Sequence, residues 1–269
     1  KAYLGKKDMD ENADWCNTAG YPLFTWTDGE QVCQKQMSLG VEKDIIQVIR
    51  SKDEECMDIL KNSMKDGGCA GIILNTVARA QDFAQKLSEC FPECEMIQMH
   101  SQFIISDRAE IEREILKRAG KNSTPEQRNK LIIVGTQVLE QSLDIDFDVM
   151  ITDLCPMDLL LQRIGREHRH KGRKRPLCLQ KAKCYVLTET RVVYDKWLLQ
   201  RTADKLTEYF CLSDDIPVYV QDVYAEPNED EKNDLWDEYM RHLEKLEEDA
   251  KRFRVGEPVC EEEDNPEFD

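Results

Sequence analysis

Apolar positions between about residue 71 and residue 188 follow two alternating periods. Short runs rich in Val, Ile, Leu and Met predict buried β-strands, and the segments between them repeat every three or four positions, as amphipathic helices do. The expected strands are Gly71–Asn75, Glu95–Met99, Leu131–Gly135, Val149–Asp153 and Cys184–Leu187. The expected helices are Ala78–Glu89, Asp107–Ala119, Val138–Ser142 and Asp158–Arg169. This alternation predicts an α/β fold with a parallel sheet, whose right-handed crossovers bring the carboxyl ends of the strands to one edge.

The predicted sheet lies between segments of different character. Residues 1–66 are expected to be an interlobe linker that leads into the sheet, with one helix at Glu54–Met64. Residues 67–190 form the expected lobe, and 191–225 a helix and connector, with an amphipathic helix at Val192–Phe210. Residues 226–269 are expected to be an acidic linker helix and tail, helical over Asp230–Phe253.

Charge is distributed unevenly along the chain. The formal net charge is −17, which at first argues against binding to nucleic acid. However, residues 162–186 hold nine Lys and Arg against one acidic residue, whereas 226–269 hold eighteen Asp and Glu against six Lys and Arg. The acidity is therefore mainly a C-terminal feature, and the predicted lobe is locally basic.

Composition also restricts the class of protein. No apolar run approaches the length of a membrane helix, and residues 1–30 lack the order of a signal peptide, so we expect no membrane contact and a cytoplasmic location. The eleven cysteines form no CxxC pair, and we expect no metal site and free thiols in a reducing compartment. The first residue is Lys, which suggests a fragment.

Two blocks carry the candidate chemistry. In Gly135–Asp144, a strand ends in a small residue followed by Thr136 at a helix start, where free backbone N–H groups can hold a phosphate oxygen. In Gln162–His170, the residues Gln162, Arg166 and Arg169 are spaced i, i+4 and i+7 and would share one helix face. We expect this arginine pair to face outward over the same sheet edge as the Thr136 turn.

Arginines on one face of a cleft fit phosphoryl transfer, because negative charge spreads over the γ-phosphate oxygens as the bond breaks. The glycine between them, Gly165, would permit close approach of a neighbouring backbone. The alternative is an exposed basic helix that makes surface ion pairs. The Thr136–Asp144 block at the right distance upstream favours the phosphate interpretation.

Together the two blocks resemble motifs V and VI of superfamily-2 helicases. Their amino-acid sequences are similar to those of the CRISPR-associated helicase-nuclease of type I systems. The segment Ile73–Gln81 resembles motif IV of that family, and His100–Phe103 with Arg108 resembles its next loop. The resemblance covers about Gly71 to His170. It implies the second RecA-like lobe of a helicase, a parallel-sheet lobe with a helical, acidic C-terminal extension.

The resemblance also implies roles for individual residues. Asp144 would bind the ATP ribose, with Gly135 and Gly165 lining the nucleotide site, while Arg166 and Arg169 reach the phosphates and Gln162 positions them. The residues implied to contact the backbone of a single DNA strand are Thr76, His100, Ser101, Arg108, Thr136 and Gln137. Asn75 would shape the motif IV turn. Two departures stand out: Gln102 replaces an expected basic residue, and Glu167 puts a carboxylate between the two arginines.

Half of an ATP site is absent from the sequence. No GxxxxGK[ST] phosphate loop occurs, and Asp53–Cys56 only imitates a DExx box because it follows a basic segment and opens a helix. No His-Asp pair suggests the nuclease domain of the resembled family. We therefore expect a chain that cannot hydrolyse ATP alone and shares ATP with a first lobe that also holds Mg²⁺.

The expected partners follow from the resemblance: single-stranded DNA, the first RecA-like lobe and nuclease domain of the same protein, and the CRISPR surveillance complex. A phage inhibitor is a further candidate partner. Two other functions stay open at this point. One is the lobe of an RNA helicase of the same superfamily. The other is a non-catalytic module whose basic stretch, 171–183, binds nucleic acid and whose acidic helix docks a partner.

Overall fold

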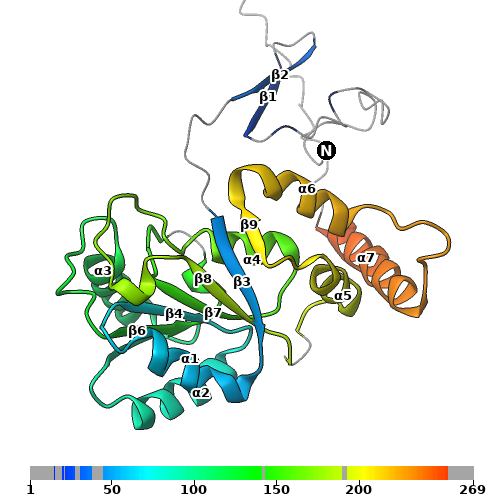
Figure 1. Cartoon of the computed structure of the whole chain (residues 1–269). Helices are drawn as coiled ribbons and strands as arrows, with labels where there is room; N and C mark the ends of the chain where they lie inside the picture. The colour runs from blue at the N-terminus through cyan, green and yellow to red at the C-terminus, as the bar shows by residue number, and fades with distance from the viewer. Residues whose placement is uncertain are drawn as a thin grey trace, which may run out of the picture. The chain divides into compact units, whose positions relative to one another are not determined.

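The computed structural model describes residues 15, 20, 22–27, 31–37, 45–140, 143–189 and 193–253 (Figure 1). Its strands are β1 (Leu23–Thr27), β2 (Val32–Gln36), β3 (Ile45–Ser51), β4 (Cys69–Ile73), β5 (Glu95–Met99), β6 (Leu131–Gly135), β7 (Val149–Asp153), β8 (Lys183–Leu187) and β9 (Tyr209–Cys211). Its α-helices are α1 (Cys56–Ser63), α2 (Val77–Cys90), α3 (Ile105–Ala119), α4 (Met157–Ile164), α5 (Lys196–Lys205), α6 (Leu212–Tyr224) and α7 (Asp234–Arg252). Short 3₁₀ turns lie at η3 (Asp53–Glu55), η4 (Gln137–Leu139) and η5 (Leu177–Leu179).

A seven-stranded sheet organises the first of two compact units, residues 1–225. The strand order is β5-β6-β4-β7-β8-β3-β9. Neighbouring strands from β5 to β3 pair in parallel, and β9 pairs antiparallel with β3 at the edge. The expected α/β fold with a parallel sheet is therefore confirmed.

The core follows from the apolar runs. Every residue of β4, β6 and β7 is buried, which is why these strands appear as continuous apolar runs rather than alternating ones. Apolar residues of α1 and α2, among them Leu60, Phe83 and Leu87, pack with Ile72, Val134 and Ile151 of the sheet. Figure 1 shows α1 and α2 together along one side of that sheet.

Three of the predicted strands, β5, β6 and β7, have the expected bounds, and β4 and β8 differ from them by one or two residues. The main correction concerns the predicted linker. Strand β3 pairs with both β8 and β9, so the sheet begins upstream of residue 67. Its burial alternates along most of its length, because it lies near the sheet edge and has one face less covered than β4 or β7.

Several predicted helices also need correction. The helix expected at Val192–Phe210 is α5 alone, followed by β9, and α6 was not predicted because it contains Pro217 and acidic residues. The helix expected at Val138–Ser142 is only the turn η4, although its last two residues lie outside the described ranges. The helix expected at Glu54–Met64 is confirmed as α1, preceded by η3.

The helix expected at Asp158–Arg169 ends at Ile164. Beyond it, Glu167 forms an isolated parallel bridge with Phe147, two residues before β7, and His168 has a positive φ of 49°. Both features prevent a helical continuation, since they require extended and left-handed backbone. The prediction that Gln162, Arg166 and Arg169 share one helix face is therefore wrong.

The second compact unit is residues 226–269, of which the structure describes 226–253. Its helix α7 starts at a cap in which Asn233 accepts hydrogen bonds from the N–H groups of Leu235 and Trp236. This confirms most of the helix expected at Asp230–Phe253. The tail expected beyond it lies outside the described residues. Among the described helices of both units, none is apolar over a length that could cross a bilayer.

Candidate nucleotide-binding and nucleic-acid-binding site

Three neighbouring strands deliver candidate residues to the carboxyl edge of the sheet. The strands β5, β6 and β4 are adjacent, and they are followed by His100, Thr136 and Thr76. Backbone hydrogen bonds tie these turns together, because Thr136 N donates to Met99 O and Leu74 N donates to Gly135 O. The structure therefore brings together most of the residues that the sequence assigned to nucleic-acid contact.

Thr76 is the N-cap of α2, and its Oγ1 accepts a hydrogen bond from Arg79 N at 3.2 Å. The preceding residue, Asn75, is buried and binds the end of β7: its N donates to Asp153 Oδ2, and its Nδ2 donates to Leu154 O. Asn75 shapes this turn, as predicted from the sequence. The partly exposed Thr76 is thus held in a fixed position at the start of a helix.

His100 is 5% exposed and stacks on Phe103, with ring centroids 4.3 Å apart. Its Nε2 lies 3.3 Å from Gln81 Nε2. Burial lowers the pKa of this imidazole, so His100 is neutral near pH 7 and offers no cationic contact to a phosphate. Ser101 and Arg108, by contrast, are exposed, and Arg108 pairs with Glu112 one helical turn away.

The turn after β6 differs from its predicted role. Thr136 is only 2% exposed, so its hydroxyl is not presented at the surface. Gln137 donates from Nε2 to Asn75 O and to Tyr194 Oη. Gly135 is required by packing, since a Cβ there would lie 2.4 Å from Met99 O. In this conformation, Thr136, Gln137 and Gly135 hold the turn together and leave no side chain free for a ligand.

A buried arginine that the sequence analysis did not select connects the two blocks. Arg163 is fully buried and pairs with Glu140 at 2.6 Å. Its Nη1 also donates to Asn75 Oδ1 and Thr152 Oγ1. Arg163 lies in the same block as Arg166 and Arg169, but it is on the buried side of α4, whereas the other two lie beyond the end of that helix.

Arg166 and Arg169 lie beyond the end of α4. The Arg166 guanidinium donates to the carbonyl oxygens of Glu140 and Leu143, and its Nε is buried without a hydrogen-bond partner among the described residues. Arg169 Nε donates to Asp144 Oδ1 at 2.8 Å, and both side chains of this pair are about half exposed. Both arginines therefore contact the segment that ends the first block, at residues 140–144.

Asp144 is the residue for which the family resemblance implies a contact with the ATP ribose. Burial raises the pKa of its carboxyl, but the hydrogen bond from Arg169 and the charge of His170 outweigh burial and hold the pKa below its usual range. His170 Nε2 lies 3.5 Å from Asp144 Oδ1. The carboxylate is therefore ionised at neutral pH and able to accept hydrogen bonds.

The two sets of residues lie at opposite edges of the sheet. Phe147 N donates to Arg166 O, and Lys183 N, at the first residue of β8, donates to Glu167 Oε1. The arginine segment is therefore at the amino ends of β7 and β8, whereas Thr136 follows the carboxyl end of β6. The prediction that both occupy one edge is wrong, because α4 runs back alongside the sheet before the arginines are reached.

Other predicted features of the site have plainer surroundings. Gln162 is exposed on α4, and a Cβ at Gly165 would meet its nearest atom at 3.3 Å, so Gly165 is less constrained than Gly135. Asp53 of the rejected DExx segment accepts hydrogen bonds from Arg79.

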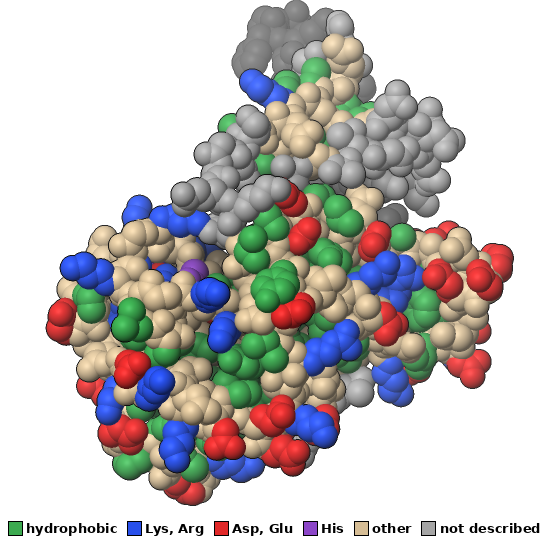
Figure 2. All heavy atoms as spheres, in the orientation of Figure 1, with side chains coloured by type: hydrophobic (Ala, Val, Ile, Leu, Met, Phe, Trp, Pro, Cys, Tyr) green, Lys and Arg blue, Asp and Glu red, His purple; other side chains and the backbone are tan. Residues whose placement is uncertain are grey.

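No group of three potential metal ligands is found among the described residues. Figure 2 shows acidic and basic side chains interspersed over α1 and α2.

A parallel sheet whose edges carry these two blocks defines a RecA-like helicase lobe of superfamily 2. Residues 66–172 match the family model described as CRISPR-associated nuclease/helicase Cas3, C-terminal. The CRISPR-associated nuclease/helicase Cas3 of Streptococcus thermophilus is 40% identical over 277 residues, which cover 96% of this chain and 30% of that protein. The chain therefore belongs to the Cas3 family and corresponds to its C-terminal helicase region. It spans less than a third of this relative's length.

Two solved structures are similar over most of the chain. A T. fusca Cas3-ATP structure has a TM-score of 0.71 and 30% identity, covering 85% of this chain and 29% of that one. A structure described as a CRISPR RNA-guided surveillance complex, pre-nicking, has a TM-score of 0.75 and 28% identity, covering 90% of this chain and 33% of that one.

Proposed function

We propose that this chain is the second motor lobe of an ATP-dependent single-stranded-DNA translocase or helicase that acts in CRISPR interference in the cytoplasm. The observation that best supports this proposal is the ion pair of Arg169 with Asp144, since a phosphate contact and a ribose contact have to be neighbours. Arg166 contacts the same segment through Glu140 O. The Cas3 relative crystallised with ATP and the relative in a surveillance complex support the nucleotide and the partner.

The site fits a nucleotide presented by another lobe. Arg166 has a buried Nε without a partner among the described residues, and Arg169 is about half exposed. An exposed ion pair such as Arg169–Asp144 is worth about 0–1 kcal/mol, whereas hydrogen bonds between arginine and phosphate are charge-assisted and often bidentate. Arg169 can therefore leave Asp144 for a phosphate, which frees the carboxylate to accept a ribose hydroxyl.

The nucleotide is shared with the first lobe, which is also proposed to hold Mg²⁺. ATP, when bound, supplies the phosphoryl bond whose cleavage drives the motor. The residues of this chain contribute positive charge where negative charge develops on the phosphate oxygens. Gln162, exposed on α4, and Gly165 are proposed to border this contact. This chain alone is proposed to be inactive as an ATPase and nuclease.

The opposite edge is the proposed DNA face. Ser101 and Arg108 are exposed there, and Thr76 is held at the start of α2. His100, Thr136 and Gln137 support these turns from within, and a direct DNA contact by them requires rearrangement. Separate edges for nucleotide and DNA suit a motor, because closure of two lobes on ATP can then alter the grip on the strand without the two ligands competing for space.

The motor role is tested by Arg166→Ala and Arg169→Ala in the full-length protein. We expect DNA-stimulated ATP hydrolysis to fall by about a thousandfold or more, while single-stranded DNA affinity without nucleotide stays unchanged. Arg113→Ala, on the exposed surface of α3, is the matched control and should change neither. Parallel loss of hydrolysis and DNA affinity in the two variants would show plain phosphate binding instead.

The remaining alternatives are separated by binding experiments. An RNA helicase lobe would bind single-stranded RNA in preference to DNA, since a site adapted to RNA contacts the 2′-OH; we expect DNA to compete at least as well. A non-catalytic module would bind nucleic acid without any effect of nucleotide. The proposed partners are the first RecA-like lobe and nuclease domain of the same protein and the surveillance complex; a phage inhibitor is a further candidate.

A further inference from the structure

A small hollow of about 270 Å³ lies between two loops, residues 120–125 and 170–174. Every charged side chain that lines it is basic or a histidine. The lining residues are Lys121, Ser123, Pro125, His170, Lys171, Gly172, Arg173 and Lys174. We call this site the basic hollow. The second loop, 170–174, belongs to the stretch 162–186 that holds nine Lys and Arg against one acidic residue, so positive charge is concentrated at this hollow.

Arg173 gives the basic hollow a fixed floor. Its side chain is 7% exposed and its Nε pairs with Asp146 at 2.6 Å. Its Nη1 donates to Ser123 O and Oγ at 2.9 Å each, and its Nη2 donates to the carbonyl oxygens of Gly120 and Lys121. One buried side chain therefore joins both loops and fixes their backbone positions. The lysines at the rim need less ordering when a ligand binds, because the loops that carry them are already held in place.

The buried charges beneath the hollow do not cancel its positive charge. Arg128, Arg173 and Arg175 share two buried carboxylates, those of Asp146 and Asp148, which leaves one positive charge in excess. Burial, and then the charge of Arg128, lower the pKa of Arg173, as expected where cations outnumber anions. An anion bound at the rim would be attracted by this excess as well as by the exposed lysines.

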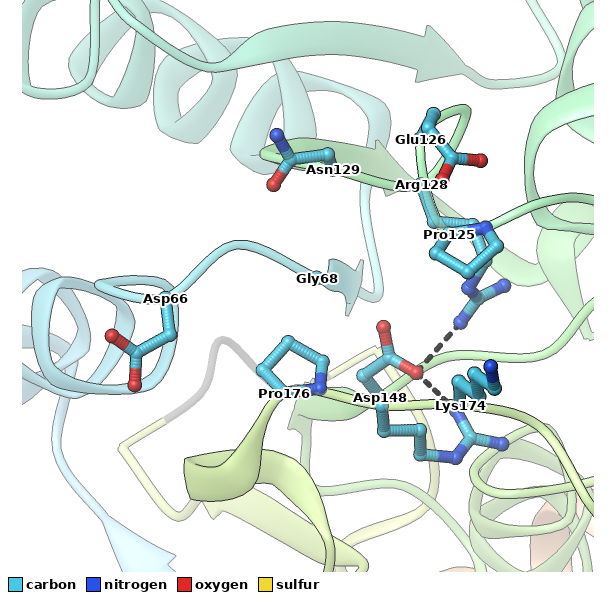
Figure 3. A pocket seen from close by; sticks show the side chains of 10 residues that line it. Asp66, Gly68, Pro125, Glu126, Arg128, Asn129, Asp148, Lys174 and Pro176 are labelled. Atoms are coloured by element: carbon cyan, nitrogen blue, oxygen red, sulfur yellow. Dashed lines mark hydrogen bonds and ion pairs between the residues drawn. The ribbon is translucent and has the colours of Figure 1, made fainter.

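A neighbouring hollow shows why the site is confined to these two loops. It shares Pro125 and Lys174 with the basic hollow, but its lining also includes Asp66 and Glu126 (Figure 3). Figure 3 shows the Arg128 guanidinium directed at Asp148, so this cation is already engaged. The neighbouring hollow is therefore close to electrically balanced and does not favour an anion.

We propose that the basic hollow binds a phosphate group, with Lys121, Lys171 and Lys174 as its contacts and Arg173 as the residue that positions them. The phosphate comes from one of two sources. One is the backbone of a nucleic-acid strand, as a contact additional to the proposed DNA face at the other edge. The other is a nucleotide at the adjacent Asp144, since His170 lines the hollow and lies 3.5 Å from Asp144 Oδ1. The nucleotide source rests on the proposed ribose contact of Asp144, whereas the strand source does not.

The test uses Lys171→Ala/Lys174→Ala in this chain, and Lys61→Ala/Lys86→Ala as the matched control, since all four lysines are exposed and each pair removes two charges. Affinity for a single-stranded DNA oligonucleotide is measured by fluorescence anisotropy at several salt concentrations, and affinity for tripolyphosphate by calorimetry. Thermal unfolding of all variants verifies that they fold, and Lys171→Gln/Lys174→Gln repeats the test with longer side chains.

If the phosphate belongs to a strand, the slope of log K for DNA binding against log salt concentration should become less negative by about one to two. This change should occur in the hollow variant and not in the control. If it belongs to a nucleotide, tripolyphosphate affinity should fall several-fold while DNA binding matches the control. Either result supports the basic hollow. The proposal is overturned if the hollow and control pairs behave alike towards both ligands. ATP hydrolysis does not enter this test, so its outcome is independent of the motor assignment.

Discussion

At the scale of single residues, Arg163 shows how a buried charge can be tolerated. Its guanidinium is fully buried, where an unpaired ion would be very costly. Four acceptors surround it: Glu140, Asn75 Oδ1, Thr152 Oγ1 and the carbonyl of Asp153. Because these acceptors come from three separate segments, Arg163 holds the turn after β4, the end of β7 and the first block in a fixed arrangement.

We expect Arg163→Ala to lower the free energy of unfolding by about 3–5 kcal/mol, since it leaves Glu140 buried without its cation. Burial already raises the pKa of Glu140 against the opposing charge of Arg163. The measurement is urea unfolding followed by circular dichroism. The double variant Glu140→Gln/Arg163→Met should be less destabilised than the sum of its single changes, because it buries no unpaired charge.

Arg113→Ala, at an exposed position, provides the baseline and should lie within about 0.5 kcal/mol of the parent chain. If Arg163→Ala lowers the free energy of unfolding by no more than this, Arg163 does not hold the three segments together.

The residue scale also limits what the sequence could predict of the site. The family resemblance implied that Asp144 and Arg169 belong to one site, and the structure pairs their side chains, whereas the i, i+4, i+7 spacing wrongly implied a shared helix face. The sequence could not show their roles. It could not show that Arg163, three positions before Arg166, faces the interior, since that depends on which side of α4 packs on the sheet. Nor could it show that Thr136 is buried, since a hydroxyl after a strand has the same sequence pattern whether it faces solvent or a neighbouring turn.

At the scale of elements, the strands were predictable and the segment after α4 was not. The strands β4, β6 and β7 are buried on both faces, so their apolar runs are continuous and bounded by turn residues. The burial of strand β3 alternates over most of its length, and the amino-acid sequence of residues 1–66 has no clear apolar period, so this strand was not predicted. After Ile164, the backbone is fixed by Glu167, which pairs with Phe147 and accepts from Lys183, two contacts distant in sequence.

Because of Glu167, the stability contributed by the segment after α4 is expected to depend on pH. Its carboxyl is buried, and burial raises its pKa well above the usual range despite the hydrogen bond from Lys183 N. The folded state therefore binds this proton more tightly than the unfolded state, so its contribution to stability is present at low pH. That contribution is lost as the pH rises from about 4.3, the ordinary glutamate value, through the raised value of the folded state.

Glu167→Gln keeps an oxygen that can accept from Lys183 N and removes the titration. We expect its melting temperature to exceed that of the parent chain by a margin that widens as the pH rises from about 4.3 towards neutrality. Differential scanning calorimetry across this range measures the margin. Glu93→Gln, at an exposed position, is the control, and a constant margin for Glu167→Gln would contradict the assignment.

At the scale of the whole molecule, charge is divided between the two compact units. Residues 226–269 hold eighteen acidic residues against six Lys and Arg, whereas the proposed phosphate contacts all belong to residues 1–225. Long-range repulsion between the acidic unit and a DNA strand opposes the attraction of the lobe, and salt screens it with a Debye length of about 10 Å at 0.1 M. The net charge of the chain therefore understates the affinity of its lobe for nucleic acid.

A chain ending at Ala225 removes this acidic unit. We expect it to bind a single-stranded DNA oligonucleotide more tightly than residues 1–269 at low salt, with the difference vanishing at about 1 M salt, where the Debye length is near 3 Å. Anisotropy titrations of both chains measure the difference. Because the acidic unit is a separate compact body, the midpoint of urea unfolding monitored on the sheet should be unchanged. An increase in affinity that persists at high salt would instead indicate that residues 226–269 block the DNA face by direct contact.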